Sequence, residues 1–258
     1  YVNDGSETTS DSFTFTVTDG TTGLSSQAFN FAINPVDDAP VATTNTGVTT
    51  AEGGTAAITA AQLNTTDVDT ARSNITYAVT SGPVNGRLEF TDNAGVSVSS
   101  FTQQDLDSGR LRYVHNGSET TSDSFTFTTS DATTTLSPAT FGISVTPVND
   151  APTAGNNTGA TVSWLGSTII TSARLSTNDV DTAAANLTYT VTNTPNNGRL
   201  ELVTNPGQAI TSFTQADIDA GRVRYVHTNF FSLSDQFRYT VSDGQYSLPQ
   251  RNFNISVN

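Results

Sequence analysis

The chain has 258 residues, with 24 acidic side chains against 10 basic ones and a net charge of −14 at pH 7. This charge balance argues against binding to nucleic acids or anionic membranes, because such binding needs clustered Lys and Arg side chains. Cysteine is absent, which excludes disulfide scaffolds and thiolate zinc sites, and no apolar stretch approaches the roughly 20 residues of a membrane helix. We therefore expect neither nucleic-acid binding nor membrane insertion. Because the chain does not begin with Met, we expect it to be a piece of a longer protein.

In chain order, the first predicted elements are two strands within the N-terminal 38 residues. Residues 12–19 read SFTFTVTD and residues 27–33 read QAFNFAI, so apolar and polar side chains alternate in both segments. Alternation with a period of two is typical of a half-buried strand. The same pattern returns at 124–128 and at 141–145.

Two short helical turns are predicted in each repeat. Thr59 and Gln62 have capping-box spacing, as do Thr102 and Asp105, and Gly109 is placed to end the second turn. Gly, Asn, Asp and Pro interrupt the remaining segments at short intervals, which indicates turns between strands.

Self-comparison shows a repeat of 112 residues. Tyr1, Tyr113 and Tyr225 begin three related segments, and the run DVDT starts at Asp67 and again at Asp179. A period of this length matches one domain per repeat. We predict two complete repeats at 39–150 and 151–258, with 1–38 as the C-terminal part of a preceding repeat. About seven strands per repeat favour antiparallel β-sandwiches of the immunoglobulin-like type, an all-β fold.

The order of motifs resembles a known family. An early EGG is followed by DVDT, GRLE, FTQQDLDSGRLRYVHNGSE, DSFTFTTSD and a closing PVNDAP. This order resembles the cadherin-like repeat of chondroitin sulfate proteoglycans, also found in Fras/Frem matrix proteins and in large bacterial surface adhesins. The resemblance implies extracellular tandem modules whose partners are neighbouring repeats, without catalysis of their own. The near-identity of 1–16 and 113–128 favours a bacterial adhesin.

Acidic residues gather at the predicted joints between repeats. In cadherins proper, acids in the linker and an Asp-x-Asp motif in the next domain bind calcium between domains, and the arrangement here is similar. A hard cation takes six to eight oxygens, which several loops at a joint can supply. The resemblance implies Ca²⁺ ligands in the linkers, in DVDT, at strand ends and at the opposite edge of the repeat: Asp37, Asp38, Asp67, Asp69, Asp131, Asn149, Asp150, Asp179, Asp181, Asp243, Glu52, Glu119 and Asp123. The alternative interpretation is that these residues only form turns and caps.

The last repeat departs from this pattern. Trp164 takes the position of Glu52 one period earlier, and Phe231 takes that of Glu119. We therefore expect no strong calcium joint beyond Asn258. The Phe230–Phe231 pair is interpreted as a plug at the end of the sandwich, or else as a contact surface.

No catalytic constellation is predicted. His115 and His227 are one period apart, which favours a structural role over a catalytic pair. The pairs Asp105/Asp107 and Asp217/Asp219 have carboxylate spacing, but a recurring turn followed by Gly and Arg favours helix caps.

Taken together, the sequence predicts a non-enzymatic extracellular stalk module of a large adhesin, stiffened by calcium. One alternative is a module that itself binds a cell-surface glycan or protein, which an exposed aromatic platform around Trp164 or Tyr246 would favour. The other is a non-catalytic arm of a secreted enzyme.

Overall fold

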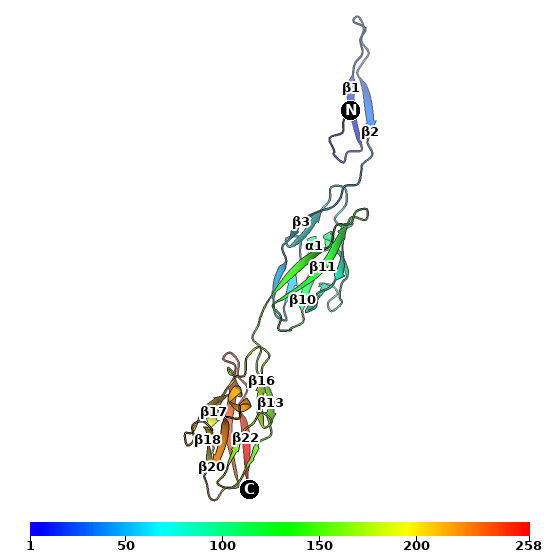
Figure 1. The fold of residues 1–258 in the computed structure, drawn as a ribbon. Helices are drawn as coiled ribbons and strands as arrows, with labels where there is room; N and C mark the ends of the chain where they lie inside the picture. The colour runs from blue at the N-terminus through cyan, green and yellow to red at the C-terminus, as the bar shows by residue number, and fades with distance from the viewer. The chain divides into compact units, whose positions relative to one another are not determined.

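A computed structural model describes all residues from 1 to 258, and they divide into two compact units, 1–147 and 148–258. Strands dominate both units (Figure 1), and the two helices, α1 (Gln103–Asp107) and α2 (Gln215–Asp219), are each a little over one turn long. None of the helices has the length and apolar character that crossing a membrane requires.

The first unit begins with a two-stranded hairpin. Strand β1 (Ser10–Phe15) pairs antiparallel with β2 (Gln27–Ala32), and no further strand joins this sheet. The two strands expected within residues 1–38 are therefore confirmed, and they pair with each other.

The rest of the first unit is a β-sandwich of two main sheets. The larger sheet has the order β4-β12-β11-β7-β9, the smaller one has the order β5-β10-β8, and β3 pairs separately with β6. All pairs are antiparallel except β12 with β4, which run parallel. The strands are β3 (Val41–Asn45), β4 (Val48–Ala51), β5 (Thr55–Ala57), β6 (Leu63–Thr66), β7 (Thr76–Ser81), β8 (Gly86–Phe90), β9 (Ser100–Thr102), β10 (Leu111–His115), β11 (Ser122–Ser130) and β12 (Ala139–Thr146).

The second unit repeats this topology strand for strand. Its sheets have the orders β14-β22-β21-β17-β19 and β15-β20-β18, with the separate pair β13-β16. The predicted tandem all-β sandwiches are thus confirmed, although each holds ten short strands where about seven were expected. The strands are β13 (Thr153–Asn157), β14 (Ala160–Val162), β15 (Ser167–Ile169), β16 (Leu175–Asn178), β17 (Thr188–Asn193), β18 (Gly198–Leu202), β19 (Ser212–Thr214), β20 (Val223–His227), β21 (Ser234–Ser242) and β22 (Arg251–Val257).

Each sandwich encloses an aromatic core that contains a buried polar network around a tyrosine hydroxyl. In the first unit the Tyr77 ring stacks on Phe101 at 4.9 Å between ring centroids. The Tyr77 hydroxyl donates to Oε1 of Gln103 at 2.6 Å, and the same oxygen accepts the backbone N–H of Thr65 at 2.8 Å. The buried phenol is thereby satisfied, as burial of a polar group requires, and Tyr189, Gln215 and Thr177 repeat the network.

The helix caps were predicted correctly, and one turn was not helical. The Thr102 side chain accepts from the Asp105 backbone, and Asp105 bonds back to the Thr102 N–H, so the capping box is present. Gly109 follows with a φ of 64°, a left-handed conformation that favours glycine. Residues 59–62 form only a hydrogen-bonded turn, in which the Thr59 carbonyl accepts from the Gln62 and Leu63 N–H groups.

A buried glutamate ties the smaller sheet of the first unit together. Glu89 on β8 lies opposite Arg112 on β10, and its carboxylate accepts from Arg87, Arg112 and the Gly95 N–H. Burial alone would raise the pKa of Glu89, but the Gly95 N–H and the two guanidinium groups outweigh it and lower the pKa to about 2. The charged form of Glu89 therefore stabilises the folded unit.

Replacing Glu89 with Gln removes this charge while the Gly95 bond can still form. We expect the free energy of unfolding at pH 7 to fall by about 1–2 kcal/mol, because the charge-assisted bonds from the two guanidinium groups weaken. Since the folded pKa of Glu89 lies below the ordinary glutamate pKa of 4.5, Glu89 contributes its stability above that value and loses it as the pH falls toward about 2. Urea unfolding at pH 7 and below pH 3 should show the deficit shrinking in acid.

The matched control is Asp92→Asn, because Asp92 forms an exposed ion pair with Arg110. Such a surface pair contributes little. An equal loss of stability in both variants would contradict the account of Glu89.

Candidate metal centre

The end of the first sandwich at which β3 begins, here called its front end, gathers carboxylates from three segments. They are the linker before β3, the DVDT loop after β6 and the residue that follows β11. Strand β6 ends at Thr66 beside Val41 of β3, so the linker residues just before β3 lie next to Asp67 and Asp69. The Asp38 N–H donates to Oδ2 of Asp69 at 3.0 Å, which holds the linker against the DVDT loop.

Backbone donors hold this loop in shape. Oδ1 of Asp67 accepts the N–H groups of Asp69 and Thr70, at 3.1 and 3.0 Å. Oδ1 of Asp131, which follows β11, accepts the N–H groups of Thr133 and Thr134. Each aspartate thus uses one oxygen for its own turn, as the turn-and-cap interpretation expected.

The second carboxylate oxygens of Asp67 and Asp131 take no part in these turns. Oδ2 of Asp67 and Oδ2 of Asp131 are buried and have no hydrogen-bond partner. Desolvation, and then the charges of Asp131 and Asp69, raise the pKa of Asp37. Turn formation does not explain why two buried carboxylate oxygens lack hydrogen-bond donors next to the Asp37 carboxylate. A bound cation would give both oxygens a partner and would balance the charge of Asp37.

The front end of the second unit has the same construction. The Asp150 N–H donates to Oδ2 of Asp181 at 2.9 Å, and Oδ1 of Asp179 accepts the N–H groups of Asp181 and Thr182. Oδ2 of Asp179 is again buried without a hydrogen-bond partner. Desolvation and then the neighbouring Asp181 side chain raise the pKa of Asp179, whereas the Asp179 side chain and the Asp150 N–H lower that of Asp181.

One amide distinguishes the two front ends. Asn149 stands where the first unit has Asp37, and its Nδ2 donates to Oδ2 of Asp243 at 2.9 Å. Desolvation would raise the pKa of Asp243, but this bond and two backbone donors outweigh it and lower the pKa. Asp37 cannot make the corresponding bond to Asp131, so the first unit holds one more carboxylate and one more unsatisfied oxygen.

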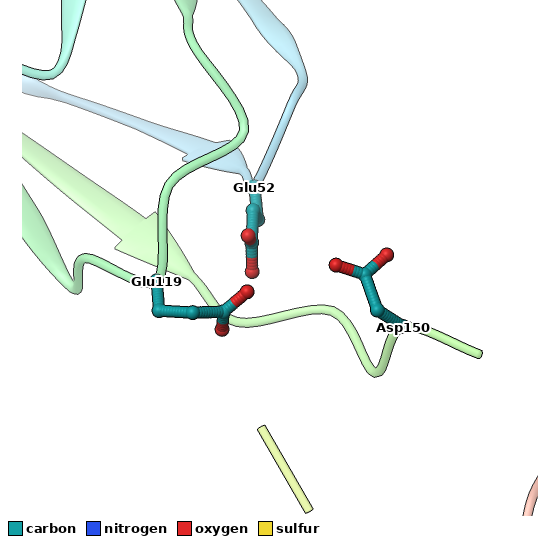
Figure 2. A group of neighbouring side chains, drawn as sticks. All are labelled: Glu52, Glu119 and Asp150. Atoms are coloured by element: carbon teal, nitrogen blue, oxygen red, sulfur yellow. The ribbon is translucent and has the colours of Figure 1, made fainter. Parts of the chain in front are cut away.

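The opposite end of the first sandwich brings Glu52 and Glu119 together. Glu52 follows β4, and its N–H bonds the carbonyl of Thr146 at the end of the parallel strand β12, four residues before Asp150. Figure 2 shows the three carboxylates, each of which offers one oxygen within 4.8 Å of the others. Four residues of chain span at most about 14 Å, so the segment from Thr146 to Asp150 is a short connection.

The sequence did not reveal that His115 positions these two glutamates. Nδ1 of the buried imidazole accepts the N–H of Gly53, next to Glu52, at 3.0 Å. Nε2 lies 3.0 Å from Oγ1 of Thr120, next to Glu119. Because Nδ1 accepts, Nε2 carries the proton and donates to Thr120. The structural role expected for His115 is therefore to hold together the two loops that carry Glu52 and Glu119.

Asp123 is not brought into this group. Its carboxylate accepts the N–H groups of Val84 and Asn85 and the hydroxyl of Tyr113, at 2.8–3.0 Å. These bonds fasten the β7–β8 loop to strand β11, which gives Asp123 a structural function.

The corresponding end of the second unit is aromatic and exposed. The Trp164 ring contacts Phe230 edge-to-face at 5.7 Å, with 51% and 59% of the two residues exposed, and Phe231 is 96% exposed. The interpretation as a plug is therefore wrong, and the contact-surface alternative remains. His227 still accepts the Leu165 N–H, but its Nε2 is buried and has no hydrogen-bond partner.

Comparison with known families matches the two sandwiches one by one. A cadherin-like family model matches residues 40–145 and again 152–257. The chain belongs to the cadherin-like family. The matched boundaries lie within two residues of the ends of β12 and β22, so each match covers one complete sandwich.

The curated relatives that match most of the chain include matrix proteins and a proteoglycan. The chain is 38% identical to human extracellular matrix organizing protein FRAS1 over 90% of its length, and 33% identical to extracellular matrix protein 3 of Lytechinus variegatus over 99%. It is 32% identical to human chondroitin sulfate proteoglycan 4 over 88%. It spans only 6%, 8% and 10% of these three relatives.

Solved cadherin structures share the fold. The extracellular cadherin domains 1–5 of protocadherin gamma B2 match 97% of this chain and 46% of their own, with a TM-score of 0.51 at 13% identity. Human CDH23 EC21-23 gives a TM-score of 0.51 at 14% identity, over 97% of this chain and 74% of that one. At such identities the likeness concerns the fold alone.

The difference between the two front ends predicts the effect of Asp37→Asn in calcium-free buffer. The amide should donate to Oδ2 of Asp131, as Asn149 does to Asp243, and should raise the melting temperature of the first unit. Because the folded-state pKa of Asp37 is raised, its charge destabilises the unit at neutral pH, and this penalty disappears as the pH falls through that pKa. The gain should therefore shrink in acid.

The reverse substitution, Asn149→Asp, provides the matched control and should lower the melting temperature of the second unit. Thermal melts of both variants at pH 7 and pH 4 in chelator measure the effect. A drop in stability on Asp37→Asn would show that the carboxylates at this end do not repel one another.

Proposed function

We propose that this chain is a non-enzymatic stalk of tandem repeats in a large surface or secreted adhesin, stiffened by calcium at the ends of its repeats. The chain is extracellular, as the cadherin-like family and the matrix relatives indicate. Relatives whose names describe extracellular matrix proteins support a function without catalysis. A bacterial source, and attachment to a secreted enzyme, stay predictions.

The observation that carries the proposal is the set of buried carboxylate oxygens without donors. Asp67, Asp131 and Asp179 each present one such oxygen at the front end of a sandwich. A hard cation needs oxygen ligands and no protons, so it would satisfy these atoms. It would also offset the desolvation and the neighbouring carboxylates that raise the pKa of Asp37 and Asp179.

Two groups of ligands follow from the proposal. At the front of the second unit, Glu52 and Glu119 of the preceding sandwich would join the acids of the linker and of its DVDT loop. At the front of the first unit, the acids around Asp67 would act without the two glutamates. The candidate ligands are Asn149, Asp150, Asp179, Asp181 and Asp243 for the former, and Asp37, Asp38, Asp67, Asp69 and Asp131 for the latter.

Calcium would act mechanically at these positions. Residues 147–152 connect the two units through a short segment outside any strand. Without a cation, the acids on this segment repel those of the adjoining loops, which favours separation. Neutralisation by a bound ion would remove the repulsion and restrict the hinge, so that a row of repeats could hold a distal binding module away from the cell.

This proposal predicts a calcium-dependent melting temperature for the whole chain. At 2 mM calcium, a site with the sub-millimolar affinity usual for extracellular modules should raise the melting temperature by roughly 5 °C over chelator. The double variant Asp179→Asn, Asp181→Asn should abolish the shift of the second unit and leave that of the first.

Asp67→Asn with Asp69→Asn should produce the converse pattern, and Asp92→Asn, outside both groups, should keep both shifts. His115→Leu should weaken the response of the joint although His115 is not a ligand, because it holds the two glutamate loops. Melting curves that coincide with and without millimolar calcium would refute the proposed calcium sites.

The exposed aromatic end of the second unit favours a second candidate function, binding of a cell-surface glycan or protein. Trp164 and Phe230 present contiguous ring surface, and such exposed patches on soluble proteins commonly mark contact sites. A glycan array probed with the chain and with Trp164→Ala tests this candidate.

Loss of a signal in Trp164→Ala, with the signal kept in Val96→Ser, would support the binding function. Val96 is also exposed but lies in the first unit. Absence of any glycan signal for the unchanged chain, together with absence of a protein partner in a pull-down, would leave the stalk function alone.

A further inference from the structure

An arginine that lies beside the short helix of the first unit is an alanine in the second. In the first unit the carbonyl of Arg72 accepts the Gln104 N–H of α1 at 3.2 Å. One period later the residue is Ala184, whose carbonyl accepts the Ala216 N–H of α2 at 3.0 Å. The backbone therefore takes the same place beside the helix in both units, and the side chain differs.

The Arg72 guanidinium is held by a fork of acceptors. Its Nε and Nη2 donate to the two carboxylate oxygens of Asp107, and Nη2 also donates to Oδ1 of Asn64 at 2.7 Å. A guanidinium matches a carboxylate in this two-bonded arrangement, which an ammonium group cannot reproduce. The Arg72 side chain accordingly lowers the pKa of Asp107.

The second unit keeps the carboxylate of this pair and the buried network that orients it. Nε2 of Gln215 donates to Oδ1 of Asp219 at 2.8 Å. The same bond joins Gln103 to Asp107 in the first unit. Gln215 is only 4% exposed, and its Oε1 accepts the hydroxyl of Tyr189 at 2.6 Å. The core of the second sandwich therefore holds the Asp219 carboxylate in position without an arginine beside it.

A pocket of about 590 Å³ lies beside Asp219. Its lining includes the residues one period after the arginine, asparagine and aspartate of the first unit, namely Ala184, Ser176 and Asp219. The shorter side chains of Ala184 and Ser176 leave room that the arginine and the asparagine occupy in the first unit. The buried side chain of Leu187 adds an apolar wall, against which the methylene stem of an arginine can pack.

We propose that this pocket binds the arginine side chain of a partner protein. Asp219 would accept two N–H groups of the guanidinium, the Ser176 hydroxyl would accept a third, and the arginine stem would lie along Leu187. The first unit already fills the equivalent place with an arginine, which is why the proposal commits to this residue. The net charge of −14 also favours approach of a basic partner.

The proposed site does not depend on calcium or on the stalk function. Asp219 is not among the proposed calcium ligands, although Asp179 also lines the pocket. Binding is therefore measured in chelator, where a failure of the calcium proposal has no bearing on the result.

The test titrates the full 258-residue chain with a blocked glycine–arginine–glycine peptide and follows the NMR signals of the Gln215 side-chain amide. The signals should shift saturably, with a millimolar dissociation constant. The same peptide with lysine in place of arginine should bind at least about fivefold more weakly, because an ammonium cannot make the paired bonds. Shifts that do not saturate, or equal binding of the two peptides, would overturn the proposal.

Substitutions locate the site. Asp219→Asn should weaken binding of the arginine peptide at least about fivefold, because the carboxylate charge is lost. The control Asp92→Asn lies in the first unit and should leave binding unchanged. Ala184→Arg should abolish the shifts, since its own side chain would occupy the pocket. Undiminished binding in Asp219→Asn or in Ala184→Arg would overturn the assignment.

The converse substitution should create a second site. Arg72→Ala with Asn64→Ser gives the first unit the residues of the second, so the Gln103 side-chain amide should then respond to the arginine peptide as well. A variant whose NMR spectrum shows a folded first unit, but whose Gln103 signals do not respond, would contradict the proposal.

Methylguanidinium distinguishes a side chain from a small guanidine as the occupant. It has the charged group without the stem, so it should bind at least about threefold more weakly than the arginine peptide, because the contact with Leu187 is lost. Equal binding of methylguanidinium and the peptide would identify a site for small guanidines and overturn the assignment to a partner's arginine.

Discussion

Crowded carboxylates held by backbone N–H groups are the feature on which the ends of both sandwiches depend. The Asp-x-Asp loops fold around their own amides and then bind the preceding linker, through Asp38 in one unit and Asp150 in the other. These bonds place like charges side by side, which is unfavourable unless a counter-charge is present. Under the proposed function, a calcium ion would supply that counter-charge at the buried second oxygens of Asp67 and Asp179.

The sandwich fold explains why these acids converge although they lie far apart in sequence. Antiparallel pairing of β3 with β6 places the linker beside the DVDT loop, and β11 ends at the same edge with Asp131. At the other edge, the parallel pairing of β12 with β4 places Glu52 where the chain leaves the sandwich. A repeat built this way carries acids at both ends, and the aromatic substitutions at Trp164 and Phe231 remove them from one end of the second unit.

Much of this could be predicted from the sequence, for identifiable physical reasons. Alternating Phe and Thr predicts strands, the 112-residue period gives the repeats, and Thr102 with Asp105 predicts the capping box. The exposure of Phe231 could not be predicted, because a plug and a bare patch have the same composition. Nor could the positioning role of His115, because its partners Gly53 and Thr120 reach it only through tertiary structure. Asp123 had the spacing of a ligand, yet the loop N–H groups occupy its carboxylate.

The central claim is that calcium binds at the carboxylate ends of the sandwiches. Equilibrium dialysis of the whole chain against radioactive calcium, at physiological ionic strength, measures this directly. The account predicts saturable binding of at least one ion per chain at about 0.1–1 mM, reduced when Asp179 and Asp181 become asparagine. Binding that never saturates, or that is unchanged in this variant, would contradict it.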